Sequence, residues 1–322
     1  MTSQKTILIT GGAGFIGSHL CAKLLEYNYR VIAIDDLSLG SEKNINHLFL
    51  NPLFSFIKLD ITNTKALSKV FREEVIHTVF HMAANSDIQK GASFLDIDFR
   101  KTFLTTFSVL ECMKTYAVKS IIFSSTSAVY GEQSTRIHED IGPLFPTSFY
   151  GAAKLCSEAY ISAFVTNFNI QAWIFRFPNV VGERATHGVI YDFINRLLTN
   201  PHELIILGDG KQRKPYLYVN DLVEGMIYGW QNATDTLNYY NLGVDSTTSV
   251  DMIATIVIEE MGLKDVYLKH SGGDRGWTGD IPHFEYNLSK INNLGWKASR
   301  SSDEAVRTAV KAELLNRKII IP

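Results

Sequence analysis

Short apolar runs alternate with longer amphipathic segments along the first half of the chain. Residues 6–10, 30–34, 56–61, 78–81, 120–123 and 172–177 form runs of the length and composition of buried strands. Residues 18–26, 64–74, 96–116 and 150–168 between them show helical spacing of apolar positions. This alternation predicts an α/β fold with a Rossmann-type, doubly wound parallel sheet.

The pattern becomes less regular after residue 177. A short strand is predicted at 204–207, and helices are predicted at 191–199, 222–232, 249–261 and 303–316. We therefore expect two domains, residues 1–175 and residues 176–322. The second is expected to be a smaller mixed α/β domain, some of whose segments return to the sheet of the first.

Composition is that of an ordinary globular protein. The chain has 322 residues, 46% of them hydrophobic and 20% charged, with a net charge of -2, which argues against a nucleic-acid-binding protein. No apolar stretch approaches the roughly 20 residues that span a bilayer, and the first apolar run begins too early for a signal peptide. We expect a cytoplasmic protein without a metal site, whose three cysteines (Cys21, Cys112 and Cys156) are reduced.

Glycines follow the first predicted strand in a pattern typical of dinucleotide binding. Gly11 permits a tight turn, Gly14 lets the backbone approach a pyrophosphate, and Gly17 allows close packing of helix on strand. Asp35 ends the second strand, where its carboxylate can accept hydrogen bonds from an adenosine ribose and repel a 2'-phosphate. The order strand, glycines, helix, strand and acid predicts bound NAD rather than NADP.

Other residues at predicted strand ends are weaker candidates. Asp60 could contact the adenine edge, with Ile61 beside it, or could equally cap the following helix. Ala83 and Ala84 are small enough to let a flat cofactor lie against the backbone. His81 is expected to be a buried, hydrogen-bonded histidine rather than a catalyst.

Tyr150 and Lys154 lie four residues apart and project from one helix face. A lysine charge beside a phenol favours the phenolate and lowers the pKa of the tyrosine, which suits it to draw a proton from an alcohol while a hydride leaves the same carbon. Such pairs also occur by chance on surface helices. Thr126 ends a predicted strand on the ligand side of the sheet, where its hydroxyl could position a substrate oxygen or only stabilise a turn.

Together these motifs resemble an extended short-chain dehydrogenase/reductase of the nucleotide-sugar epimerase/dehydratase branch. The likeness rests on the glycines of residues 11–17, on Ser125-Thr126 before Val129-Tyr130-Gly131, and on Tyr150-Gly-Ala-Ala-Lys154. Residues 176–182 and 215–221 resemble the family's substrate-side signatures, so the likeness extends to about residue 315.

The resemblance implies roles for individual residues. Tyr150 would be the base, Lys154 would lower its pKa and hold the nicotinamide ribose, and Thr126 would orient the sugar hydroxyl. Cofactor-binding residues would be Gly11, Gly14, Phe15, Ile16, Gly17, Asp35, Asp60, Ile61, Ala83, Ala84, Ser124, Tyr150 and Lys154. Substrate-binding residues would be Ser86, Thr126, Ser127, Asn179, Val189, Arg213, Lys214, Tyr216 and Arg275. Helices 96–116 and 150–168 would pair across a homodimer as a four-helix bundle.

Cations in the second half are candidates to hold the substrate diphosphate, which we favour for the first group over the alternative of a solvated hairpin. The family usually has Arg where this chain has Lys214, with Arg213 one residue earlier, and only Arg offers a planar two-pronged donor. A later glycine-rich loop, residues 272–280, carries Arg275 and also Trp277, which could flank the sugar or only pack.

The reaction is narrowed by two residues that follow Thr126. A 4,6-dehydratase of this family has a carboxylic acid there to remove water, whereas this chain has Ser127 and Ala128. The remaining reactions are 4-epimerisation of a nucleotide sugar through a transient 4-keto sugar, which we favour, and net 4-oxidation by a dehydrogenase that recycles NADH with a second carbonyl compound. A non-catalytic NAD-binding protein is the least expected.

Overall fold

The computed structural model describes residues 4–276 and 280–319. The chain forms two compact units, and neither is one continuous segment. The first comprises the chain up to Tyr130 together with Leu144–Arg176 and Met226–Tyr240; the second comprises Gly131–Pro143, Phe177–Gly225 and the chain from Asn241 onward. Trp277 lies outside the described residues.

The first unit is built on a seven-stranded sheet of order β11-β6-β5-β4-β1-β2-β3. The strands are β1 (Thr6–Thr10), β2 (Arg30–Asp35), β3 (Phe54–Lys58), β4 (Thr78–His81), β5 (Ser120–Thr126), β6 (Gln171–Phe177) and β11 (Leu237–Asn241). β1 pairs in parallel with both β2 and β4, so the strand order reverses at this point. The predicted doubly wound α/β sheet is confirmed, and ligands of such sheets bind beyond the carboxyl ends of the strands at the reversal.

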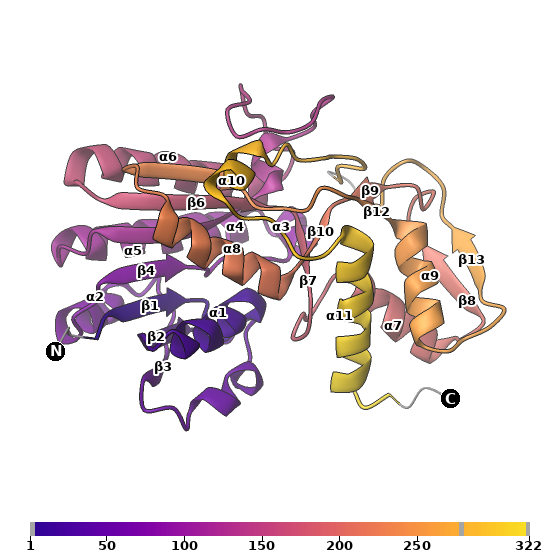
Figure 1. Ribbon diagram of the computed structural model, residues 1–322, viewed down its shortest axis with the longest axis horizontal. Coiled ribbons are helices and arrows are strands. Elements are labelled where there is room, and N and C mark those ends of the chain that lie inside the picture. The colour runs from indigo at the N-terminus through magenta and orange to yellow at the C-terminus, as the bar shows by residue number, and fades with distance from the viewer. Residues whose placement is uncertain (1–3, 277–279, 320–322) are drawn as a thin grey trace. The chain divides into compact units, whose positions relative to one another are not determined.

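Helices cover both faces of this sheet (Figure 1). They are α1 (Phe15–Glu26), α2 (Thr64–Glu73), α3 (Ile88–Ser93), α4 (Leu95–Asp98), α5 (Thr105–Thr115) and α6 (Phe149–Phe168). Leu8 packs on the face that receives Leu67 of α2, Leu110 of α5 and Ile161 of α6. Its fully buried neighbours Ile7 and Ile9 point to the other face because side chains alternate along a strand.

The segment predicted as one helix at 96–116 is interrupted by a turn of π-helix, η3 (Phe99–Leu104), between α4 and α5. Thr105 Oγ1 accounts for part of this departure, since it donates to the carbonyl oxygens of Lys101 (3.1 Å) and Thr102 (2.9 Å). Such back-bonding bends helices, and π-turns occur often at functional sites. Three short 3-10 turns complete the unit: η1 (Glu42–Asn44), η2 (Asn46–Leu48) and η4 (Ser127–Tyr130).

The second unit contains three small sheets and four helices among its described residues. The strand pairs are β7 (Asn179–Val181) with β10 (Tyr216–Tyr218), β8 (Glu203–Ile206) with β13 (Tyr267–His270), and β9 (Arg213–Lys214) with β12 (Thr248–Ser249). The helices are α7 (Val189–Thr199), α9 (Val250–Glu260), α10 (Ser289–Leu294) and α11 (Ser302–Asn316), and α8 (Val219–Asn232) runs from this unit into the first.

Two further sequence expectations can be compared with the structure. Cys21 and Cys112 are buried, as expected of small hydrophobic residues, while Cys156 is only half-buried. Over the described ranges, the structure has no helix long and apolar enough to cross a membrane.

Candidate active site

The glycine-rich turn between β1 and α1 is closed to side chains. Gly11 has a φ of +69°, and a Cβ there would lie 2.8 Å from the backbone nitrogen of Ala83. A Cβ on Gly17 would lie 2.0 Å from the carbonyl oxygen of Gly11. Gly14, which precedes α1, has no side chain to cap the first turn, so the helix keeps open N–H groups for an anion.

Asp35 lies beside this turn. Its Oδ2 accepts from the backbone nitrogen of Ala13 (3.0 Å), and its Oδ1 accepts from that of Leu37 (2.8 Å). Burial raises the pKa of the Asp35 carboxyl, and the backbone N–H donors partly offset this. The turn and the carboxylate form a cradle with the donor and acceptor set that an adenosine ribose and a pyrophosphate require, so the residues fit NAD.

Lys101 joins two carboxylates next to Asp35, a contact that sequence reasoning missed. Its Nζ donates to Asp36 Oδ2 and to Asp60 Oδ2, both at 2.7 Å. Burial alone would raise the pKa of each carboxyl, but the hydrogen bond and charge of Lys101 hold both below the usual value. The alternative role of Asp60 as a helix cap is wrong, because Asn63 caps α2 through Ala66.

Tyr150, Lys154 and Thr126 meet where β5 ends against the start of α6. Close approach is possible because Gly151 has no Cβ, which would lie 2.5 Å from the carbonyl oxygen of Ala128. The Thr126 hydroxyl hydrogen-bonds to the phenol of Tyr150. Lys154 Nζ lies 5.9 Å from the centroid of the Tyr150 ring and donates to the carbonyl oxygen of Ser124 (2.5 Å).

The pKa of Tyr150 differs from the sequence expectation. Burial raises the pKa of its phenol, the negative charge of Asp98 raises it further, and the Thr126 hydrogen bond only partly opposes them. Lys154 is 1% exposed, and burial lowers its pKa to about 7 although Glu158 acts in the opposite direction. The lysine therefore carries only part of its charge near neutral pH, which explains why its proximity alone does not lower the pKa of the phenol.

Buried partners hold the groups behind Lys154. Glu158 accepts from Arg176 Nη2 (2.5 Å) and from Ser125 Oγ (2.5 Å). His81 is fully buried, and its ring nitrogens lie 2.7 Å from Thr10 Oγ1 and 3.0 Å from Thr106 Oγ1. Burial lowers the pKa of His81 to about 3, so the predicted structural histidine is confirmed.

In the second unit, Asn179 and Tyr216 face each other on paired strands and are hydrogen-bonded. Two of the cations predicted to hold the diphosphate are paired with acids. Lys214 forms an ion pair with Asp280, and Arg275 contacts Glu132 Oε1 at 2.9 Å. Arg213 differs, since its exposed guanidinium donates to the carbonyl oxygen of Thr247 (3.2 Å).

The remaining predicted cofactor-binding and substrate-binding residues differ in burial. Ile61 is buried, Ala83, Ala84 and Ser127 are half-buried, Ser86 is exposed, Phe15 and Ile16 form the first turn of α1, and Val189 begins α7.

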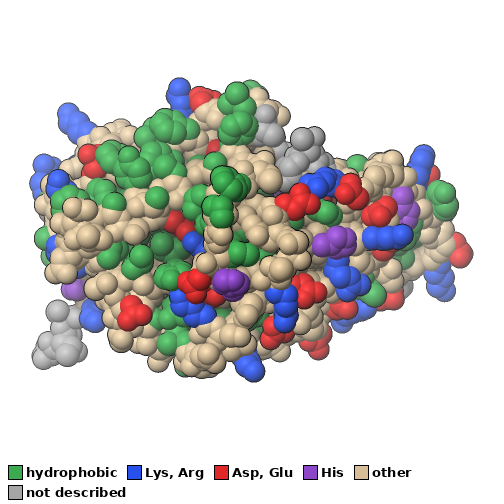
Figure 2. Space-filling view, turned by 90° about the horizontal axis from the view of Figure 1, so that it is seen from above, with side chains coloured by type: hydrophobic (Ala, Val, Ile, Leu, Met, Phe, Trp, Pro, Cys, Tyr) green, Lys and Arg blue, Asp and Glu red, His purple; other side chains and the backbone are tan. Residues whose placement is uncertain are grey.

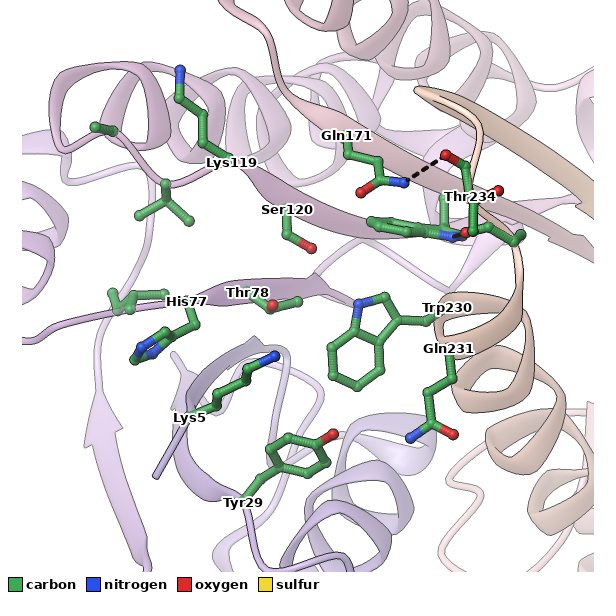
Figure 3. Close-up of a pocket in the computed structure, with 15 residues that line it drawn as sticks. Lys5, Tyr29, His77, Thr78, Lys119, Ser120, Gln171, Trp230, Gln231 and Thr234 are labelled. Carbon is green, nitrogen blue, oxygen red and sulfur yellow. Dashed lines mark hydrogen bonds between the residues drawn. The ribbon is translucent and has the colours of Figure 1, made fainter. Parts of the chain in front are cut away.

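A cavity of about 690 Å³ lies at the opposite edge of the sheet, where β1, β4, β5 and β6 begin. Figure 3 shows the Trp230 indole and the Lys5 chain beside it, while Lys119 points away. Lys119 Nζ is bound to the carbonyl oxygen of Phe168. The cavity is not lined by any of the predicted site residues.

Comparisons with known proteins agree with this geometry. The model of the NAD dependent epimerase/dehydratase family matches residues 7–243. The chain belongs to this NAD-dependent epimerase/dehydratase family. It is an enzyme family whose cofactor is NAD, and the cradle formed by Gly11, Gly17 and Asp35 is where this family member would hold it.

Relatives in the family carry out more than one reaction. A Methanocaldococcus jannaschii protein with the provisional name UDP-glucose 4-epimerase is 33% identical, over 94% of this chain and 97% of its own. The UDP-glucuronic acid 4-epimerase of Bacillus cereus, solved with a UDP-sugar derivative and NAD, has a TM-score of 0.86 and 29% identity, covering 97% of this chain and 99% of its own. The dTDP-D-glucose 4,6-dehydratase of Dictyostelium discoideum is 29% identical, over 94% of this chain and 80% of its own.

Proposed function

We propose that this protein is an NAD-dependent 4-epimerase of nucleotide-diphosphate sugars that acts through a transient 4-keto sugar. The observation that supports the proposal most strongly is the Thr126–Tyr150–Lys154 cluster at the carboxyl end of β5, followed by two residues without acid or base function, Ser127 and Ala128. Epimerase names among the relatives support the same reaction.

The roles of the residues follow from their contacts. When bound, NAD supplies the hydride acceptor and a positive charge that favours the phenolate. Tyr150 takes the proton of the sugar hydroxyl and later returns it, and the Thr126 hydroxyl, already bonded to the phenol, aligns donor and acceptor. Lys154 would hold the nicotinamide ribose of bound NAD, and its charge, gained below its pKa of about 7, would stabilise the phenolate.

Dehydration is disfavoured because the two positions after Thr126 carry no carboxylate and the nearby Glu158 is committed to other contacts. Glu158 is held by Arg176 and Ser125. Ser127 begins η4, and its hydroxyl cannot act as a strong acid or base near neutral pH. An epimerase needs neither group, since the hydride leaves and returns at C4 and the proton leaves and returns at the C4 hydroxyl oxygen.

On the substrate side, we assign Asn179, Tyr216 and Val189 to the nucleotide-sugar and Arg213 to its diphosphate. Arg213 is the better cation because, among the described residues, its guanidinium bonds a backbone carbonyl and no acid, whereas Lys214 would have to leave Asp280. Arg275 would likewise exchange Glu132 for phosphate. Removing a carboxylate from a paired cation is costly, so these two are secondary contacts.

We propose a homodimer through α5, α6 and the π-turn η3, which precedes α5. Tyr160 on α6 is 41% exposed, and its ring lies against Phe103 (4.9 Å between centroids) and Phe107 (6.0 Å). Figure 2 views the face that carries α6 and shows apolar side chains gathered over it. Exposed apolar patches of this kind mark association surfaces. A Tyr160→Glu variant should elute as a monomer where the wild type is a dimer by light scattering.

Incubation with UDP-, GDP-, CDP- and dTDP-sugars tests the reaction. Epimer formation without net change in NADH is expected. Accumulation of NADH with a 4-keto sugar would replace the proposal with a 4-dehydrogenase, and a product lighter by one water would replace it with a dehydratase.

A further inference from the structure

Asp98 is a buried carboxyl group that none of the proposed roles uses. It ends α4, is 1% exposed, and its Oδ1 accepts from Asn85 Nδ2 at 2.9 Å. Its Oδ2 is buried and has no hydrogen-bond partner in the described part of the chain. A buried carboxylate oxygen without a donor is costly, so its retention calls for an explanation.

The surroundings of Asp98 leave room for the carboxyl, and among the side chains that the structure describes no cation is bonded to it. Gly91 of α3 lies directly against it, and a Cβ at that position would be 2.0 Å from Asp98 Oδ2. Burial raises the pKa of Asp98, the hydrogen bond from Asn85 partly opposes this, and the negative charge of Asp87 adds to it.

Asp98 and Tyr150 lie on elements that pack against each other. α4 and the π-turn both pack against α6, which carries the phenol. Among the side chains that the structure describes, the titratable groups that face the phenol are Asp98 from α4 and Lys154 from its own helix. Lys154 is in turn faced by Glu158 of α6, which is paired with Arg176 of β6, and by His81 of β4.

We propose that Asp98 is a positioning residue whose negative charge sets the pH at which Tyr150 becomes a base. The proposal rests on the proposed function of Tyr150 and deepens it. Two negative charges in one water-poor site disfavour each other, so ionised Asp98 makes the phenol of Tyr150 hold its proton more strongly. The phenolate is thereby a stronger base toward the sugar hydroxyl, and the acid limb of the pH profile lies at higher pH.

The test is the Asp98→Asn variant, in which the charge is lost and the size is kept. In the NAD-bound enzyme labelled with ¹³Cζ-tyrosine, the resonance absent from Tyr150→Phe identifies Tyr150, and its titration can be followed without any sugar. We expect its midpoint to fall by about one pH unit or more in Asp98→Asn. The acid limb of kcat/KM should move by the same amount.

Asp96→Asn is the matched control, because Asp96 lies on the same helix with its side chain 64% exposed and paired with Arg100. It should leave the Tyr150 midpoint unchanged. If the amide of Asn cannot be accommodated beside Gly91, the smaller Asp98→Ser variant provides the same loss of charge.

An unchanged Tyr150 midpoint in folded, NAD-binding Asp98→Asn would overturn the proposal, as would an equal shift in Asp96→Asn. Failure to form an epimer from any sugar would instead contradict the proposed function, while the resonance of Tyr150 would still report on Asp98.

Discussion

Lys101 of the π-turn and Asp98 just before it create opposite environments for negatively charged side chains. Within the turn, Lys101 bonds two carboxylates, Asp36 and Asp60, and their pKa values lie below the usual range. Just before the turn, the buried Asp98 accepts a hydrogen bond from the amide of Asn85, and its pKa is raised. One segment of chain therefore bonds a cation to the acids near Asp35 and, among the described side chains, leaves the acid near Tyr150 without one.

The two environments suit the two roles proposed for them, cofactor binding around Lys101 and proton transfer at Tyr150. Binding needs carboxylates that stay ionised and accept hydrogen bonds over a wide pH range, and a bridging cation ensures this. Proton transfer needs a group whose proton affinity is tuned near the working pH, and an unpaired neighbouring charge tunes it. The strongest tests replace a residue in one environment and measure NAD affinity and turnover separately.

Replacing Tyr150 by Phe should have the largest effect. Removal of the only proton acceptor assigned to the reaction is expected to lower kcat by about 10²–10⁴-fold. The affinity for NAD should stay close to that of the wild type, since the cradle around Asp35 is unaltered. Steady-state kinetics and an NAD titration measure both. Tyr160→Phe on the same helix is the control, and near-normal turnover in Tyr150→Phe would remove the phenol from its role.

Lys154→Met tests how much the burial of the lysine charge beside Tyr150 lowers the stability of the fold. The unfolded chain binds a proton at Lys154 up to its usual pKa of 10.5, whereas the folded chain binds it only up to about 7. The contribution of Lys154 to the free energy of unfolding is therefore most favourable above pH 10.5. It falls by about a few kcal/mol as the pH drops from 10.5 to 7. Relative to wild type, the variant should gain stability on going from pH 10 to pH 7, as measured by urea unfolding.

An exposed lysine provides the control for that series. Lys65→Met on α2 should follow the wild-type pH dependence. A Lys154→Met curve that parallels the wild type would show that the buried amine keeps its proton through this range.

Lys101→Met should have a smaller and more local effect. Without the cation, Asp36 and Asp60 repel each other and the diphosphate, so NAD affinity is expected to fall by about five- to tenfold. The Kd from calorimetry and kcat at saturating NAD separate binding from chemistry. A large fall in kcat at saturating NAD would mean that the contacts of Lys101 and the proton transfer at Tyr150 are not independent.

Sequence patterns predicted the parts of this site that depend on neighbouring residues. The glycine turn, the acid at the end of β2 and the Tyr150–Lys154 pair each follow from short-range spacing, and the structure places them at the carboxyl ends of the expected strands. The π-turn was missed because the helical periodicity of 96–116 does not reveal one extra residue in a turn.

Contacts between distant residues could not be predicted in the same way. Lys101 and Asp36 are 65 residues apart, and no local pattern pairs them. The same holds for the pairing of Lys214 with Asp280, 66 residues apart, which places an acid beside a predicted phosphate ligand. The pKa of Tyr150 is raised and not lowered as expected, because desolvation disfavours the charged forms of both Lys154 and the phenol.

The central claim is that the hydride returns to the C4 carbon that it left, while the proton returns to the oxygen on that carbon. A nucleotide sugar that proves to be a substrate, labelled with deuterium at C4 and incubated with the enzyme and NAD in ordinary water, tests this by NMR of the product. The account predicts an epimer with inverted C4 that keeps its deuterium at that carbon. A product with hydrogen at C4, or a released 4-keto sugar with deuterium on reduced NAD, would contradict it.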